Sequence, residues 1–172
     1  MLASKKARGF SLVEVVIAVG VFAVAVATTL SLLPSMTRQM ANAGDALAAQ
    51  RIAGNLRIEL QRLAASGFDG LASQAPVMAA PLVNGLEFVA TREGLPLHSL
   101  AIPPSSNPIA TENQYFLVEA WRFNQAPLAF VGSSAVLPLY VRVSWPYQNP
   151  GSASPTPLAD RAQLTFTVSI NR

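Results

Sequence analysis

A single acidic residue lies inside the longest apolar stretch of the chain. Glu14 comes four residues after Phe10, and residues 15–27 contain no polar side chain. A carboxylate near the centre of a bilayer costs about 3 kcal/mol on an insertion scale, and less close to the interface. A neighbouring cation removes that cost, and the low dielectric of the membrane strengthens the attraction between the two charges. Glu14 is therefore suited to ion pairing inside a membrane.

Other residues that could catalyse a reaction or bind a metal are scarce. The chain has one histidine, His98, and no cysteine, which argues against a transition-metal site or a thiol nucleophile. His98 lies in a proline-flanked stretch without a nucleophile motif, and we expect a solvated loop histidine. Asp69, Asn84 and Glu87 are too few and too scattered for a calcium loop. We therefore expect no enzyme activity, no cofactor and no metal.

The segment around Glu14 has the length and the flanking charges of a membrane helix. As a helix, residues 10–33 would extend about 36 Å, enough for a hydrocarbon core of ~30 Å. Lys5, Lys6 and Arg8 precede it, so we expect a cytoplasmic N-terminus and an exported remainder. These three residues account for the net charge of +3, because the other nine basic residues balance the nine acidic ones. No specific nucleic acid partner is predicted.

The residues at this boundary resemble the prepilin N-terminal motif. A basic leader ends in Gly9, Phe10 follows, and Glu14 is the fifth residue counted from Phe10. The resemblance implies that a membrane-embedded prepilin peptidase cuts between Gly9 and Phe10 and methylates the new amine of Phe10. It also implies that Glu14 faces the N-terminal ammonium of a neighbouring subunit, where the pair could fix the register between helices. Ser11 and Glu14 fit a helix capping box as well, and the two roles are compatible.

The resemblance also implies a function and a location. It implies a structural subunit, a type IV pilin or pseudopilin. The length and the lack of cysteine favour a minor subunit. The sequence VRVSW at residues 141–145, followed by a loop and a final strand, resembles the minor pseudopilins of type II secretion and PilV-like minor pilins, and the whole chain is similar to the pseudopilin-like cassette proteins of Verrucomicrobia. The implied partners are other pilin or pseudopilin subunits, a prepilin peptidase, an inner-membrane assembly platform and, before assembly, membrane lipid. The protein would cross the inner membrane once, with a periplasmic head, and then enter a periplasmic or extracellular filament.

An ordinary secretory signal peptide is the main alternative. The basic and apolar regions fit one, and residues 25–27 offer an A-x-A cleavage site before Thr28. Glu14 argues against it, because the apolar region of a signal peptide avoids acids, and apolar character continues to Leu33. In this alternative a secreted or periplasmic binding domain follows the cleaved peptide. A plain single-pass anchor is a third interpretation.

Beyond the apolar segment the spacing predicts an amphipathic helix over residues 34–66. Its apolar positions recur every three or four residues, with one shift of phase: Met36, Met40, Ala43 and Leu47, then Ile52, Leu56, Leu60 and Leu63. Pro34 is the first helix breaker after the apolar segment, and Gly67 fits a helix end. We expect residues 68–85 to form a loop that contains the turn pair Asn84-Gly85.

From residue 86 the apolar residues alternate with a period of two, which is typical of strands. The predicted strands cover residues 86–91, 115–123, 127–131, 139–145 and 163–171. Arg142 and Ser144 fall on the polar face, and four aromatic residues are expected to pack against core or sheet rather than form a binding platform: Trp121, Tyr140, Trp145 and Tyr147.

The predicted fold class is therefore α+β, a long N-terminal helix packed on an antiparallel sheet of four or five strands. Four regions are expected: a basic leader at residues 1–9, a transmembrane and assembly helix at 10–33, an amphipathic helix at 34–66, and an extracytoplasmic head at 67–172.

Overall fold

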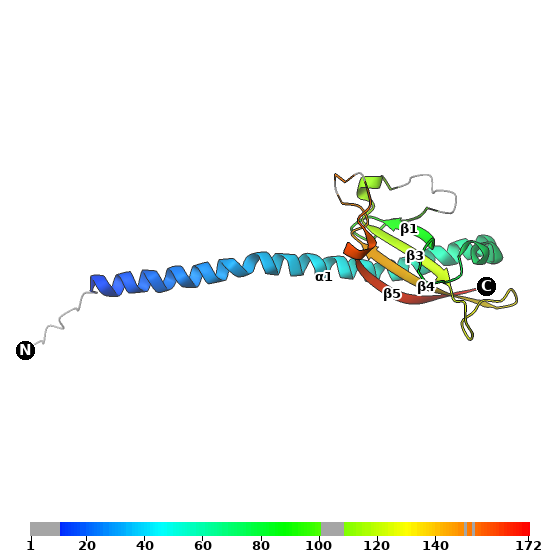
Figure 1. Cartoon of the computed structure of the whole chain (residues 1–172), viewed down its shortest axis with the longest axis horizontal. Helices are drawn as coiled ribbons and strands as arrows, with labels where there is room; N and C mark the ends of the chain where they lie inside the picture. The colour runs from blue at the N-terminus through cyan, green and yellow to red at the C-terminus, as the bar shows by residue number, and fades with distance from the viewer. Residues whose placement is uncertain (1–10, 101–108, 150, 153) are drawn as a thin grey trace, which may run out of the picture. The chain divides into compact units, whose positions relative to one another are not determined.

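The computed structural model describes residues 11–100, 109–149, 151–152 and 154–172. The described chain folds as one long helix followed by an antiparallel sheet, which confirms the predicted α+β class (Figure 1). The elements are α1 (Leu12–Gln74), β1 (Leu86–Ala90), β2 (Leu97–Ser99), β3 (Phe116–Arg122), β4 (Val136–Trp145) and β5 (Ala162–Asn171). Contacts divide the chain into two units, the first ending at Ala43 and the second beginning at Gly44.

The first unit consists of the N-terminal part of α1. Every described side chain in residues 11–43 is exposed, and α1 contains a window of mean hydropathy 2.5 near the N-terminus, none of it buried. By length and composition this helix can cross a membrane. Hydroxyl groups in and after the apolar run donate to backbone carbonyls three or four residues earlier, including those of Thr28, Thr29 and Ser31. The hydroxyl groups at these positions therefore have hydrogen-bond acceptors within the helix and need none from lipid.

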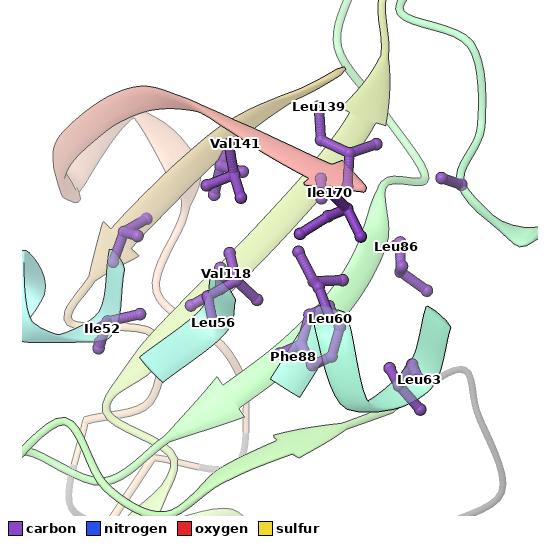
Figure 2. Close-up of a cluster of buried hydrophobic side chains, with 14 of the residues drawn as sticks. Ile52, Leu56, Leu60, Leu63, Leu86, Phe88, Val118, Leu139, Val141 and Ile170 are labelled. Carbon is purple, nitrogen blue, oxygen red and sulfur yellow. The ribbon is translucent and has the colours of Figure 1, made fainter. Parts of the chain in front are cut away.

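In the second unit, α1 buries one face. Buried residues recur along the helix at Asp45, Ala48, Ala49, Ile52, Leu56, Leu60 and Leu63. Figure 2 shows Ile52, Leu56 and Leu60 among the strand side chains Phe88, Val118 and Ile170. Burying one such Leu or Ile side chain contributes about 1.5–3 kcal/mol, so this stripe supplies much of the attraction between helix and sheet. The second half of the predicted apolar stripe is confirmed.

The first half of that stripe is not buried. Met36, Met40 and Leu47 are 55%, 74% and 55% exposed. The buried face begins at Asp45 and continues through Ala48 and Ala49, so the change of phase that the sequence displays is the point where core packing starts.

The predicted helix end and the predicted loop were partly wrong. Gly67 departs from helical geometry, with φ 163° and ψ 89°, so the helix is interrupted there. Helical structure resumes and ends at Gln74, because Phe68 and Leu71 offer another apolar pair to the core and are buried. The loop therefore covers residues 75–85 rather than 68–85, and Asn84 adopts the left-handed φ of 51° that suits the predicted turn.

The sheet has the order β2-β1-β3-β4-β5, and all neighbouring strands are antiparallel. Four predicted strands are present with small shifts of their ends. The short strand predicted at residues 127–131 was wrong, since this stretch is a turn followed by irregular chain. A strand that was not predicted, β2, pairs with β1 and contains His98.

Both faces of the sheet centre are buried. One face, including Phe88, Val118 and Val141, packs against α1. On the opposite face Arg142 is 8% exposed and Ser144 is fully buried. The two residues lie on the face that the alternation predicts, but that face is not solvated. The loop of residues 82–85 covers Arg142, and Arg161 Nη1 donates to Ser144 Oγ at 3.3 Å.

Candidate functional site: the start of the N-terminal helix, a buried ion pair and a buried acid

Glu14 and Ser11 cap the first turn of α1. The Ser11 backbone N–H donates to Glu14 Oε2 at 3.2 Å, and the Val13 N–H donates to Ser11 Oγ at 3.2 Å. The two side chains thus satisfy backbone donors at the helix start, as a capping box does. A negative side chain also suits the positive end of the helix dipole. This local role of Glu14 is confirmed.

The Glu14 carboxylate retains unused capacity. A carboxylate can accept about four hydrogen bonds, and only the Ser11 N–H reaches it in the described chain. Among the described residues no Lys or Arg forms an ion pair with Glu14. The carboxylate borders a shallow apolar hollow of about 500 Å³ lined by Val15, Ala18, Val19 and Phe22. Glu14 is thus a negatively charged hydrogen-bond acceptor beside an apolar surface, and it can pair with a cation from outside the described chain.

Gly9 and Phe10, the proposed cleavage and methylation residues, lie outside the described residues. The comparison with protein families covers them. Residues 4–30 match the family described as the prokaryotic N-terminal methylation motif. This chain carries that motif. The methylation motif spans the basic residues, Gly9, Phe10 and Glu14, and supports a type IV pilin-like protein.

The methylation motif covers only the start of the chain. No curated protein and no solved structure matches the chain. The motif together with a membrane-length helix fits anchoring in the inner membrane followed by entry into a filament, with processing by a prepilin peptidase and assembly with other subunits.

The other polar residues singled out from the sequence are dispersed. His98 lies in strand β2 opposite Val89 and is half-buried, so the expectation of a solvated loop histidine was wrong. Asp69 pairs with Arg172, while Glu87 lies opposite Glu119 across β1 and β3. Within the described ranges no three His, Cys, Asp or Glu side chains are grouped as metal ligands would be.

The aromatic residues pack, as expected from the sequence. Trp121 is buried, and its Nε1 donates to the Val83 carbonyl at 3.1 Å. Its ring centroid lies 6.2 Å from that of Tyr140, and the rings of Trp145 and Phe116 are 5.7 Å apart. These contacts belong to the two faces of the sheet, so the rings are not free to form a flat exposed platform.

A buried ion pair lies on the sheet face opposite to α1. Arg142 binds Glu119 and also lies over the Trp121 ring, with Cζ 5.0 Å from the ring centroid. Glu87 is the cross-strand neighbour of Glu119, and burial together with the Glu119 charge raises the pKa of Glu87. Glu87, Glu119 and Arg142 are therefore neighbours across three strands, with two carboxylates beside one arginine. The protonation of Glu87 should therefore change with pH.

A second buried acid lies on α1 and was missed by the sequence reasoning. Asp45 is 8% exposed and accepts hydrogen bonds from Arg92 Nε at 3.1 Å, Arg92 Nη2 at 3.3 Å and the Tyr115 hydroxyl at 2.7 Å. Burial and the hydrogen bond to Asp45 raise the pKa of Tyr115 to about 12. The spacing in the sequence could have predicted its burial. Asp45 precedes Ala48 and Ile52 by three and seven residues, so it lies on the same face of the helix as these buried residues.

Proposed function

We propose that this chain is a structural minor pilin or pseudopilin subunit of a type IV pilus-like or type II secretion filament. The observation that carries the proposal is the coincidence of the methylation motif at residues 4–30 with a wholly exposed apolar helix that carries one acid, Glu14. An exposed apolar helix needs lipid or neighbouring helices around it. A structural role, without enzyme activity, is sufficient for such a chain.

In this proposal the N-terminus is processed first. A prepilin peptidase cleaves between Gly9 and Phe10, which removes the basic leader of residues 1–9, and the new amine of Phe10 is methylated. Cleavage leaves an ammonium group on Phe10, and Glu14 becomes the fifth residue of the mature chain. Residues 10–33 then hold the chain in the inner membrane, with residues 34–66 and the head, 67–172, on the periplasmic side.

Assembly follows from the charge on Glu14. A lone carboxylate in lipid is costly, and it has no ion-pair partner in the described chain. The methylated ammonium of a neighbouring subunit would relieve that cost and would favour one axial register between the two helices. An assembly ATPase and an inner-membrane platform protein then extract the subunit into the filament, which lies in the periplasm or outside the cell.

Identification of the mature N-terminus tests this function. Full-length protein expressed in a host with a prepilin peptidase is recovered from membranes and sheared filaments, and its N-terminal peptide is measured by mass spectrometry. N-methylated Phe10 is expected. A chain that begins at Thr28 would instead identify a secreted or periplasmic binding domain behind a signal peptide, and an intact Met1 would identify a plain anchor; either result contradicts the proposal.

A further inference from the structure

Strand β5 forms one edge of the sheet, and no other strand of the described chain pairs with its outer side (Figure 1). On its inner side it pairs with β4 over its whole length, in one continuous register. The opposite edge is β2, which has only three residues. Proteins usually protect an exposed edge by keeping the strand short or by interrupting it. One edge of this sheet is therefore protected, and the other is long and open.

Every second residue of β5 directs its backbone away from β4. The Arg172 N–H donates to the Ala135 carbonyl at 2.9 Å, and these two residues lie opposite each other in the continuation of the β4–β5 register. Bonded and non-bonded positions alternate in an antiparallel pair, so the even-numbered residues of β5 bond to β4 and the odd-numbered ones face outward. Pro138 agrees with this phase, because it lies opposite Ser169 and has no N–H to donate. The backbone N–H and C=O groups of the odd-numbered residues therefore have no partner within the sheet.

The outward positions carry no protective charge. The three central ones are Thr165, Thr167 and Ser169, and their side chains are exposed. No charged residue and no proline occurs between Arg161 and Arg172. Charged side chains and prolines are the usual means of preventing another strand from pairing with an edge. The outer side of β5 is therefore suited to accept a further strand through main-chain hydrogen bonds.

The two faces of β5 define the side chains that such a strand needs. Leu164 and Phe166 pack against the core on the face toward α1, but they are only partly buried. Apolar side chains on an added strand would cover their exposed parts. On the other face Thr165 lies beside Arg142, whose charge is already paired with Glu119. A charged side chain on the added strand would find no free counter-ion on β5, so the matching segment is uncharged and alternates between apolar and polar residues.

A second copy of β5 does not fit the geometry of a membrane-anchored subunit. Two antiparallel β5 strands would be related by a twofold axis perpendicular to the sheet. From Gly44 onward α1 packs along the face of the sheet, and this axis reverses every direction in the plane of the sheet. The helix would then run in opposite directions in the two copies, whereas subunits anchored in one membrane enter it in the same direction. The added strand therefore comes from a segment other than β5.

We propose that β5 pairs with an extended, uncharged segment of a neighbouring filament subunit, which adds a further strand to the sheet. The contact consists of main-chain hydrogen bonds to the odd-numbered residues of β5 and of apolar contacts to Leu164 and Phe166. This inference rests on the proposed filament function, which brings subunits together, but it concerns the head and not the apolar N-terminal segment.

Amide hydrogen exchange tests the added strand, because its effect alternates along β5. Filaments and the full chain in detergent are labelled in deuterated water, and single amides are resolved by fragmentation in the mass spectrometer. The amides of Phe166 and Val168, bonded to β4, should exchange slowly in both preparations. Those of Thr165 and Thr167 should exchange about tenfold or more slowly in filaments than in detergent, the effect of about one net hydrogen bond. Equal exchange at Thr165 and Thr167 in both preparations overturns the inference, as does equal slowing at Gly132, an exposed turn residue.

Substitutions at Thr167 test the same contact and leave the hydrogen bonds to β4 in place. Thr167→Pro removes an outward N–H, and Thr167→Lys places a charge on the open edge. Both should lower incorporation into sheared filaments about tenfold or more. Thr167→Val, the matched control, keeps the backbone and the β-branched shape and should be incorporated at the natural level. If Thr167→Pro weakens folding, Thr167→Lys decides, and its incorporation at the natural level overturns the inference.

A photoreactive benzoylphenylalanine in place of Thr167 identifies the partner in filaments. A covalent link to an extended segment of another subunit is expected, and a link between the β5 strands of two copies, or only within one chain, overturns the inference. The mature N-terminus is determined in the same preparation. Methylated Phe10 together with freely exchanging edge amides would refute the added strand and leave the proposed function standing. Protected edge amides in a chain that begins at Thr28 would support the added strand and contradict the proposed function.

Discussion

Arg142 directs Nε and Nη2 to the same oxygen of Glu119, at 2.9 and 2.8 Å. The two residues are cross-strand partners on β3 and β4, and their side chains are 9% and 8% exposed. Trp121 lies under the guanidinium and the Leu82 carbonyl accepts from Nη2, so the Arg142 charge is shielded from water. Substitution of one partner alone would leave a buried charge without its counter-ion, whereas substitution of both would not.

Removal of one partner of this pair should destabilise the protein strongly. In Glu119→Ala the Arg142 charge stays buried without its acceptor, and we expect a loss of about 3–5 kcal/mol in the free energy of unfolding. Chemical denaturation of the full chain in mild detergent, followed by tryptophan fluorescence, measures the change. The double variant Glu119→Leu/Arg142→Leu should recover part of it; a double variant less stable than Glu119→Ala would contradict this account.

Glu87 should make stability depend on pH. Burial and the Glu119 charge raise the pKa of Glu87 above 4.5, so the folded protein holds its proton more firmly than the unfolded chain does. The contribution of protonated Glu87 to the free energy of unfolding is fully present below pH 4.5. It is lost as the pH rises through the raised pKa that Glu87 has in the folded protein. Glu87→Gln should thus be more stable than the natural chain at pH 7, and the difference should shrink as pH falls toward 4.5. A difference that does not vary with pH would refute the linkage.

Tyr115 should resist ionisation in strong base. Its pKa is raised to about 12, so the phenol stays neutral in the folded protein while the unfolded chain ionises near 10.0. The stabilisation is present below pH 10 and is lost as pH rises through about 12. Ultraviolet titration of phenolate should reveal one late tyrosine, which is absent in Tyr115→Phe.

The same variant tests the hydrogen bond to Asp45. Without the Tyr115 hydroxyl, buried Asp45 keeps only its two bonds from Arg92, and a loss of about 1–3 kcal/mol is expected. Tyr140→Phe is a matched control on a half-buried tyrosine of β4 and should have a smaller effect. Equal stability of Tyr115→Phe and the natural chain would show that the bond contributes nothing.

A side chain at position 85 should displace the loop that covers the second face of the sheet. A Cβ on Gly85 would lie 2.9 Å from Glu119 Cβ and from the Trp121 ring. We expect Gly85→Ala to cost about 1–3 kcal/mol by overpacking, and to shift the tryptophan emission. Gly132→Ala is the control, because no atom lies within 4 Å of the added Cβ.

Glu14 should be required for assembly but not for membrane insertion. Glu14→Ala removes the acceptor for a neighbour's ammonium, so the protein should be processed and membrane-bound yet absent from sheared filaments. Ser11→Ala is the control, because it removes the local cap on the Val13 N–H and keeps the carboxylate. Incorporation of Glu14→Ala at the natural level would show that the acid acts only as a cap.

Strongly periodic segments could be predicted from the sequence, and short or covered ones could not. Ile52 to Leu63 and Leu164 to Ile170 repeat often enough to reveal helix and strand, and both are present. Strand β2 has only three residues, too few for a period. Residues 127–131 are not a strand although they include apolar residues; Phe130 packs on Phe68 from an irregular segment, with ring centroids 5.9 Å apart.

In the candidate site, too, some residues could be predicted from the sequence and others could not. Gly9, Phe10 and Glu14 are close in sequence, so their pattern could be recognised directly. Asp45 and Tyr115 are 70 residues apart and meet only through the packing of α1 on the sheet. Alternation on β4 indicated the face on which Arg142 lies, but not that a loop from residues 82–85 covers it.

In the described chain no buried residue precedes Asp45. Substitutions before Asp45 therefore affect contacts with lipid or other subunits, and substitutions after it affect the packing of the protein interior. Exchanges of one apolar side chain for another in residues 12–43 should leave the melting of the head unaltered, and their tolerance would measure how the helix fits lipid and its neighbours. Exchanges of buried residues from Asp45 onward would measure how well the interior is packed. The sequences of these two parts of the chain can therefore change at independent rates during evolution.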